Sequence, residues 1–307
     1  MKGCNINGKV ANTWAVPDWA EGKSERIEIP LTPRQLQRWN RWPEILSECL
    51  DAANPHVAVV RKTLAETKPG PKFAAAVQKL TEKGERDAVK KYRKQPGKIN
   101  VTRDGDVQSN VSRLPESTRS VLQIDGLDAV EFDIKSAHVC LLGMFYTGEI
   151  GRDWLTEKKR FCDEAKQGFS AIYGEEKKWK IKFLSALNQS MRVAVHASDG
   201  YRKFERMFPL LAEKLARLRG RDGKQLGRKL RVTLAEIIKI ALIENGKDGI
   251  KSIPVIDSMV IAKPEDFAAR HRAEFRTAWR LGEPIARLTG APITIVGSDG
   301  ESYCFHP

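Results

Sequence analysis

Two aspartates, Asp133 and Asp257, each lie at or near the end of a short apolar run, in the segments Val130–Ser136 and Pro254–Ile261. Runs of β-branched and apolar residues of this kind predict buried strands. An ionised carboxylate there is costly unless it is paired, hydrogen-bonded or bound to a metal ion. Two such carboxylates from distant parts of the chain could hold a pair of cations for in-line phosphoryl or nucleotidyl transfer.

Each aspartate also has a simpler explanation. Asp133 could cap a following helix, and Asp257 could occupy a hairpin turn, where aspartate is common. For either residue alone we favour the simpler explanation. For the pair together we favour a shared metal site.

The bulk composition points to a polyanionic partner. The chain of 307 residues has 53 Lys and Arg against 39 Asp and Glu, which gives a net charge of +14. Such a balance favours nucleic acid, although a solvated basic surface is the alternative.

Five scattered cysteines without a Cys-x-x-Cys pair indicate neither a disulfide framework nor a thiolate zinc site, so we expect a cytoplasmic protein. The sequence has no apolar stretch long enough to predict a membrane helix.

The elements expected to position the two aspartates are those of an α+β protein. Residues 1–99 predict a basic, mainly helical region, irregular over about the first 30 residues, and residues 100–307 a mixed region. One strand ends at Asp133, and a long apolar helix over 229–244 leads to a hairpin with Asp257 and Ser258 at its turn. Further elements are expected as helices at 137–146, 153–172, 175–190, 201–219 and 264–282, and as a final hairpin at 293–305. The helix at 201–219 is expected to be interrupted near Phe208-Pro209.

Four segments in this order resemble a known family. They are Arg113–Arg119 followed by Phe132–His138, then Leu234–Leu242, then Val255–Ile261. The region from about 110 to 262 resembles the palm and fingers of family A DNA polymerases and single-subunit phage RNA polymerases. The Asp-Ile-Lys-Ser form is also similar to small plasmid and phage proteins of that superfamily, some of them primases. The chain departs from the family pattern at Ile256, where a histidine usually precedes the second aspartate.

The resemblance implies a fold and a cofactor. It implies a right-hand polymerase-like palm with an antiparallel sheet, helical fingers inserted at about 150–225, and an N-terminal region 1–99 that is thumb-like or binds nucleic acid. Asp133, Asp257 and the backbone carbonyl of Ile134 would bind two Mg²⁺ ions, for which Mn²⁺ can substitute. The partners would be a DNA template, a primer strand and nucleoside triphosphates, with a replicative helicase as a possible further partner and no membrane.

The resemblance also implies contacts to the nucleotide and to nucleic acid. Fingers of this family grip the triphosphate through a lysine, for which we favour Lys182, with Lys178 on the same helix face and Asn188 where the family has tyrosine. Lys166 before Tyr173 is the competing register. The remaining expected contacts are His138 near the ribose, and Arg113 and Arg119 on the template-primer. Each type of contact has a simpler explanation. The lysines could be solvated at the surface, His138 could lie in the core, and an arginine could cap a helix.

The leading interpretation is a template-directed nucleotidyltransferase, a DNA polymerase or primase that extends a 3′ hydroxyl by a two-metal mechanism. A non-catalytic nucleic-acid-binding replication protein on a degenerate polymerase scaffold is the alternative. It would explain both the charge and the missing histidine. A metal-dependent nuclease using the same carboxylates is less favoured, because few further acidic or histidine ligands lie near the two motifs.

Overall fold

The computed structural model describes residues 3–6, 9–12, 54–102, 107–173, 183, 199–218 and 224–307. The chain divides into two compact units, Met1–Leu50 and Asp51–Pro307. In the first unit, β1 (Gly3–Ile6) and β2 (Lys9–Asn12) form an antiparallel pair in which Gly3 lies opposite Asn12. This segment was expected to be irregular. The strands flank the Asn-Gly sequence at positions 7 and 8, a typical hairpin signal.

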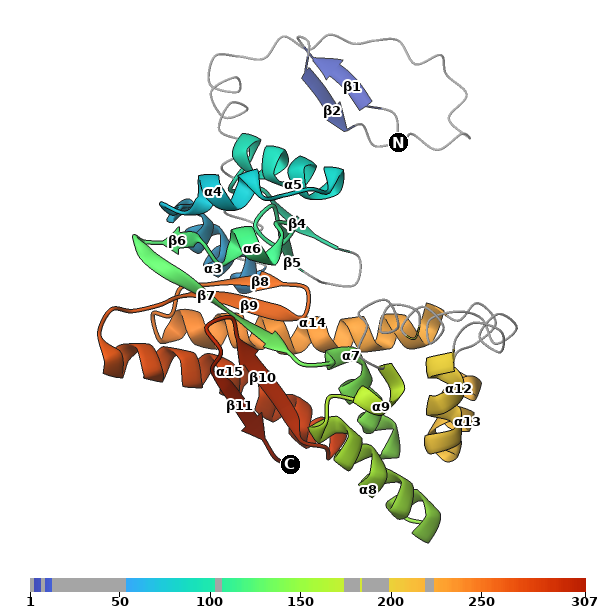
Figure 1. The fold of residues 1–307 in the computed structure, drawn as a ribbon. Helices are drawn as coiled ribbons and strands as arrows, with labels where there is room; N and C mark the ends of the chain where they lie inside the picture. Colours follow the sequence, from blue (N-terminus) through green and yellow to red (C-terminus); the bar gives the residue numbers. More distant parts are fainter. Residues whose placement is uncertain are drawn as a thin grey trace, which may run out of the picture. The chain divides into compact units, whose positions relative to one another are not determined.

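An antiparallel sheet forms the centre of the second unit (Figure 1). Its described strands are β3 (Thr67–Pro69), β6 (Leu122–Ile124), β7 (Leu127–Ile134), β8 (Ser252–Val255), β9 (Ser258–Ala262), β10 (Ile293–Gly297) and β11 (Ser302–Phe305). The long strand β7 pairs with β6, β9 and β10, so it connects all parts of the sheet. The protein is therefore an α+β fold with an antiparallel sheet, as the sequence predicts.

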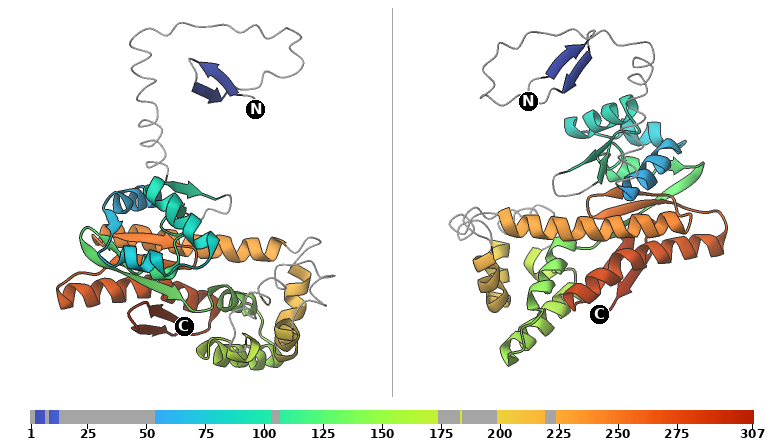
Figure 2. Two further views of the ribbon diagram at one scale, coloured as in Figure 1. Left: turned by 45° about the horizontal axis from the view of Figure 1, so that its top comes forward. Right: turned by 180° about the vertical axis from the view of Figure 1, so that it is seen from behind.

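Two long helices cover one face of this sheet, α14 (Lys224–Lys247) and α15 (Phe267–Thr289) (Figure 2). Apolar residues of the strands meet them because side chains alternate between the two faces of a strand. The buried side chain of Asn245 in α14 joins both layers. Its amide donates to Sδ of Met259 in β9 at 3.2 Å and to Oγ1 of Thr277 in α15 at 3.1 Å. No helix in the described ranges is long and apolar enough to cross a bilayer.

Residues 54–99 belong to the same compact unit as the sheet. They form α3 (Pro55–Ala65), β3, α4 (Phe73–Gln78), α5 (Lys83–Lys94) and the start of β4 (Ile99–Val101), which pairs with β5 (Val107–Ser109). Strand β3 pairs with β6, and α3 packs on α14 and β8. The approach of α3 to α14 is close, since a Cβ added at Gly246 would lie 2.9 Å from Cγ2 of Val59. The boundary expected between residues 99 and 100 is therefore replaced by one at Leu50 and Asp51.

Helices lie between β7 and α14 in the sequence. Strand β7 leads into α7 (Ala137–Cys140) and a 3₁₀ helix (Leu141–Tyr146), and the described helices that follow are α8 (Arg152–Lys166), α9 (Ser170–Tyr173), α12 (Asp199–Met207) and α13 (Pro209–Leu218). The predicted interruption at Phe208-Pro209 is confirmed. Phe161 anchors this region through ring contacts with Tyr146, Phe169 and Phe208 at centroid distances of 5.1–5.4 Å.

A buried carboxylate joins α8 to α13. Glu157 accepts hydrogen bonds from the backbone N–H groups of Leu210 at 2.9 Å and Leu211 at 2.8 Å, and from the hydroxyl of Tyr146 at 3.0 Å. It therefore satisfies donors at the start of α13 that have no partner inside that helix. Burial, together with the adjacent charge of Glu157, raises the pKa of Tyr146. Tyr146 consequently remains a neutral hydrogen-bond donor.

Helix α15 extends beyond the end expected near Gly282. It continues through Pro284 to Thr289 and ends at Gly290, whose φ of 64° lies in the left-handed region. Gly282 allows close packing and does not stop the helix, because a Cβ at this position would collide with the ring of Phe305 in β11. Gly282 therefore marks a close contact between α15 and β11.

This packing predicts that Gly282→Ala destabilises the protein. Overpacking costs about 1–3 kcal/mol, which exceeds the gain of about 1 kcal/mol from replacing glycine by alanine in a helix. The matched control is Gly84→Ala in α5, where a Cβ meets nothing within 4 Å. Urea denaturation should show a lower free energy of unfolding for Gly282→Ala and no loss for Gly84→Ala. Equal stability of the two variants would contradict the close contact.

Candidate two-carboxylate site

Asp133 and Asp257 lie on neighbouring elements at one end of the central strands. Asp133 is the penultimate residue of β7, and Asp257 lies in the turn between β8 and β9. Strands β7 and β9 pair in a register that puts Asp133 opposite Ser258. The backbone N–H of Ile134 donates to the carbonyl of Asp257 at 3.2 Å. The sheet thus brings together two residues that are far apart in the sequence.

Both aspartates lie at the surface, above a tightly packed layer. Asp133 is exposed and Asp257 half-buried, whereas Ile134, Met259 and Val260 are at most 1% exposed. The two-residue turn consists of Ile256 and Asp257, one position earlier than expected, so Ser258 belongs to β9.

The turn itself is strained. Ile256 has a φ of 23°, and positive φ at the first position of a two-residue hairpin normally selects glycine. A β-branched residue there stores backbone strain of a kind often found at functional sites. The side chain of Ile256 is 58% exposed, so burial of the isoleucine does not account for its presence.

The donor set at this end of the sheet suits a hard cation. The described residues contain no group of three or more His, Cys, Asp or Glu side chains arranged to hold a metal ion. A structural zinc site would need such a group. Mg²⁺, in contrast, is commonly held by one or two carboxylates, with substrate phosphates and water completing its shell. Asp133 and Asp257 fit that requirement.

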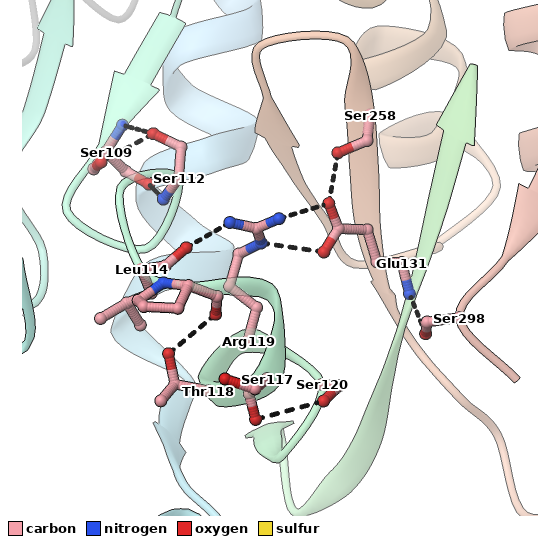
Figure 3. Close-up of polar contacts among 11 residues, drawn as sticks. Ser109, Ser112, Leu114, Ser117, Thr118, Arg119, Ser120, Glu131, Ser258 and Ser298 are labelled. Carbon is pink, nitrogen blue, oxygen red and sulfur yellow. Dashed lines mark hydrogen bonds and ion pairs between the residues drawn. The ribbon is translucent and has the colours of Figure 1, made fainter. Parts of the chain in front are cut away.

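A buried ion pair joins Arg119 to Glu131, which lies two positions before Asp133 in β7 (Figure 3). Nε and Nη2 of Arg119 donate to Oε2 and Oε1 of Glu131 at 2.8 and 2.9 Å, and Nη1 donates to the carbonyl of Leu114. The hydroxyl of Ser258 donates to Oε1 of Glu131 at 2.5 Å. The side chains of Arg119 and Glu131 are 13% and 7% exposed. The guanidinium of Arg119 was expected to contact nucleic acid. In the structure it instead donates hydrogen bonds to Glu131 and Leu114.

Glu131 is the residue at this site that the sequence interpretation missed. It lies two positions before Asp133 in β7, so both side chains lie on the same face of the strand. Its position between the apolar residues Val130 and Phe132 was a usable signal, because a buried carboxylate requires a partner. The identity of that partner could not be predicted from spacing alone.

Lys166 lies close in sequence to a loop that reaches the end of β7. The loop after α8 passes Ser136, whose hydroxyl donates to the carbonyl of Gly168 at 3.4 Å. Lys166 itself is exposed, and its Nζ is 3.5 Å from Oδ1 of Asp163. The residues of the favoured register lie outside the described part of the chain, namely Lys178, Lys182 and Asn188.

His138 and Arg113 both reach the surface. His138 is half-exposed on α7, which starts just after Ser136 adopts a φ of 57° and redirects the chain at the end of β7. Arg113 is exposed in the loop before α6 (Glu116–Arg119). Both positions are compatible with contacts to a substrate.

Helix α5 presents a basic surface. Its buried residues, Val89 and Tyr92, hold it against the protein. Its basic side chains are all exposed, and they are Lys83, Arg86, Lys90, Lys91, Arg93 and Lys94. This arrangement supplies exposed charge suited to phosphates.

No protein-family model matches the chain, and no curated protein matches it either. Among solved structures, a match is the POL domain of Pol1 from M. smegmatis, in a complex with DNA primer-template and dNTP. The match has a TM-score of 0.38 and 13% sequence identity, and it covers 66% of this chain. The chain spans 47% of the length of that structure.

Proposed function

We propose that this protein is a template-directed nucleotidyltransferase, a DNA polymerase or primase that adds nucleotides to a 3′ hydroxyl. The observation that carries the proposal is the meeting of Asp133 and Asp257 at one surface of β7 and β9. The antiparallel sheet would act as a palm, and the helices between β7 and α14 as fingers. The net charge of +14 and the exposed cations of α5 favour a nucleic-acid substrate.

In this proposal the two carboxylates, with the carbonyl of Ile134, would hold two Mg²⁺ ions, for which Mn²⁺ could substitute. When bound, these ions lower the pKa of the attacking hydroxyl and stabilise the departing pyrophosphate. The backbone hydrogen bond from Ile134 to Asp257 would keep the two segments that carry the acidic residues side by side before substrate arrives. Such preorganisation lowers the reorganisation required during reaction.

The contacts to substrate come from the surrounding elements. Lys182 is our preferred triphosphate ligand, with Lys178 and Asn188 on the same segment and Lys166 as the alternative. His138 would lie near the ribose. Arg113 and α5 would hold the template and primer through their phosphates, which fix position without reading sequence.

The decisive experiment supplies the purified protein with primed and unprimed single-stranded DNA, separate NTP and dNTP pools, and Mg²⁺ or Mn²⁺. We expect metal-dependent products. Extension of the primer identifies a polymerase, and short products made without a primer identify a primase. Salt-sensitive DNA binding with no product under any condition would overturn the proposal in favour of a non-catalytic binding protein. Release of short fragments from labelled DNA without added nucleotides would identify a nuclease instead.

A further inference from the structure

We infer that Arg119 and Glu131 are positioning residues that fix the turn carrying Asp257 against Asp133. The inference depends on the proposed function, because it concerns the same two carboxylates. Its basis is the continuous set of contacts from α6 through β7 to β9 shown in Figure 3. We call Arg119, Glu131 and Ser258 the positioning chain.

The positioning chain shares one face of the sheet with the acidic site. Glu131 and Asp133 lie on the same face of β7, since side chains alternate along a strand. Ser258 lies directly opposite Asp133, and residues opposite each other in an antiparallel pair share a face. The hydroxyl of Ser258 nevertheless donates diagonally to Glu131. The residue that follows Asp257 is therefore tied to β7 independently of any ligand.

The contacts of Glu131 give it a different role from that of Asp133. Oε1 accepts from Arg119 and from Ser258, and Oε2 accepts from Nε of Arg119. With its side chain 7% exposed, Glu131 faces the protein, while Asp133 is exposed at the end of the same strand. Arg119 also neutralises a carboxylate that would otherwise repel Asp133 and Asp257. Glu131 is thus a support for the site, and we do not count it among the metal ligands.

The strained turn explains why a support is useful. Ile256 holds an unfavourable backbone angle next to Asp257, and such a conformation persists only where surrounding contacts enforce it. The hydrogen bond from Ser258 and the hydrogen bond between Ile134 and Asp257 hold the turn on its β9 side. Loss of the Ser258 contact would let the turn relax and would move the carboxylate of Asp257.

The test compares two serine-to-alanine variants that each remove one hydrogen bond to Glu131. Ser258→Ala removes the contact that reaches the Asp257 turn. Ser298→Ala removes the 3.0 Å bond in which the Glu131 backbone N–H donates to the hydroxyl of Ser298, in the loop between β10 and β11. The measurements are Mn²⁺ binding by electron paramagnetic resonance without nucleotide, steady-state incorporation kinetics, and urea denaturation to confirm that both variants fold.

We expect Ser258→Ala to weaken Mn²⁺ binding about tenfold and to lower kcat with little change in KM for the nucleotide, as for loss of a bond to a charged group. Ser298→Ala should bind Mn²⁺ like the wild type. Equal Mn²⁺ binding by both variants and the wild type would overturn the inference even if the wild type polymerises. A wild type that binds Mn²⁺ but makes no product would overturn the proposed function, and the comparison of Mn²⁺ affinities would still test the positioning chain.

Discussion

Replacing either Asp133 or Asp257 by asparagine is expected to reduce nucleotide incorporation about a thousandfold or more. Asparagine keeps the size of the side chain but removes the charge that binds a divalent cation. Metal ions contribute several kcal/mol to this kind of reaction, and each 1.36 kcal/mol corresponds to a factor of ten in rate. Because Asp133 is exposed and Asp257 half-buried, the substitutions should leave the core intact.

The matched control is Asp128→Asn on the same strand. Asp128 is exposed near the other end of β7, where Oδ1 accepts a hydrogen bond from the side chain of Gln123 at 3.2 Å. We expect this variant to retain activity. Steady-state incorporation on primed and unprimed templates measures all three variants, and circular dichroism confirms their fold. If Asp133→Asn or Asp257→Asn incorporated nucleotides at the wild-type rate, the proposed two-metal site would be wrong.

Local patterns predicted most of the secondary structure around the site. The final hairpin at 293–305 is confirmed, as are the strand that carries Asp133 and the interruption at Phe208-Pro209. These elements have strong local signals, namely alternation, turn residues and proline. The β8–β9 hairpin was predicted with its turn displaced by one residue, because the sequence favours a turn at Asp257-Ser258, whereas the strand register assigns Ser258 to β9.

Non-local contacts explain what the sequence did not reveal. Gly282 resembles a helix stop until the ring of Phe305 is seen beside it. The boundary at residues 99 and 100 was inferred from composition, but β3 pairs with β6 and attaches the basic helices to the sheet. The motif predicts that Arg119 binds a phosphate, and only the fold shows that its guanidinium forms an ion pair with Glu131. In each case a partner from another element determines the role of the residue.

The ion pair predicts that Arg119→Ala destabilises the protein by about 3–5 kcal/mol, the usual cost of removing one partner of a buried pair. The expected loss comes chiefly from Glu131, whose carboxylate would remain buried with Ser258 as its side-chain donor. A double variant, Arg119→Ala with Glu131→Gln, should recover part of the stability because the buried group is then neutral. Urea denaturation of the single and double variants forms a double-mutant cycle that measures the coupling.

Arg113 provides the comparison that separates folding from binding. Both arginines were expected to contact nucleic acid, but Arg113 is exposed whereas Arg119 is enclosed by Glu131 and Leu114. Arg113→Ala should therefore change the free energy of unfolding by less than about 0.5 kcal/mol. If Arg113 contacts a phosphate, its loss should also weaken DNA binding and reduce the salt dependence of that binding. A variant Arg119→Ala that remained fully stable but bound DNA weakly would reverse these roles. The two arginines lie six positions apart in one motif, so the motif does not distinguish them. The difference in their burial predicts that loss of Arg119 affects stability, whereas loss of Arg113 affects DNA binding.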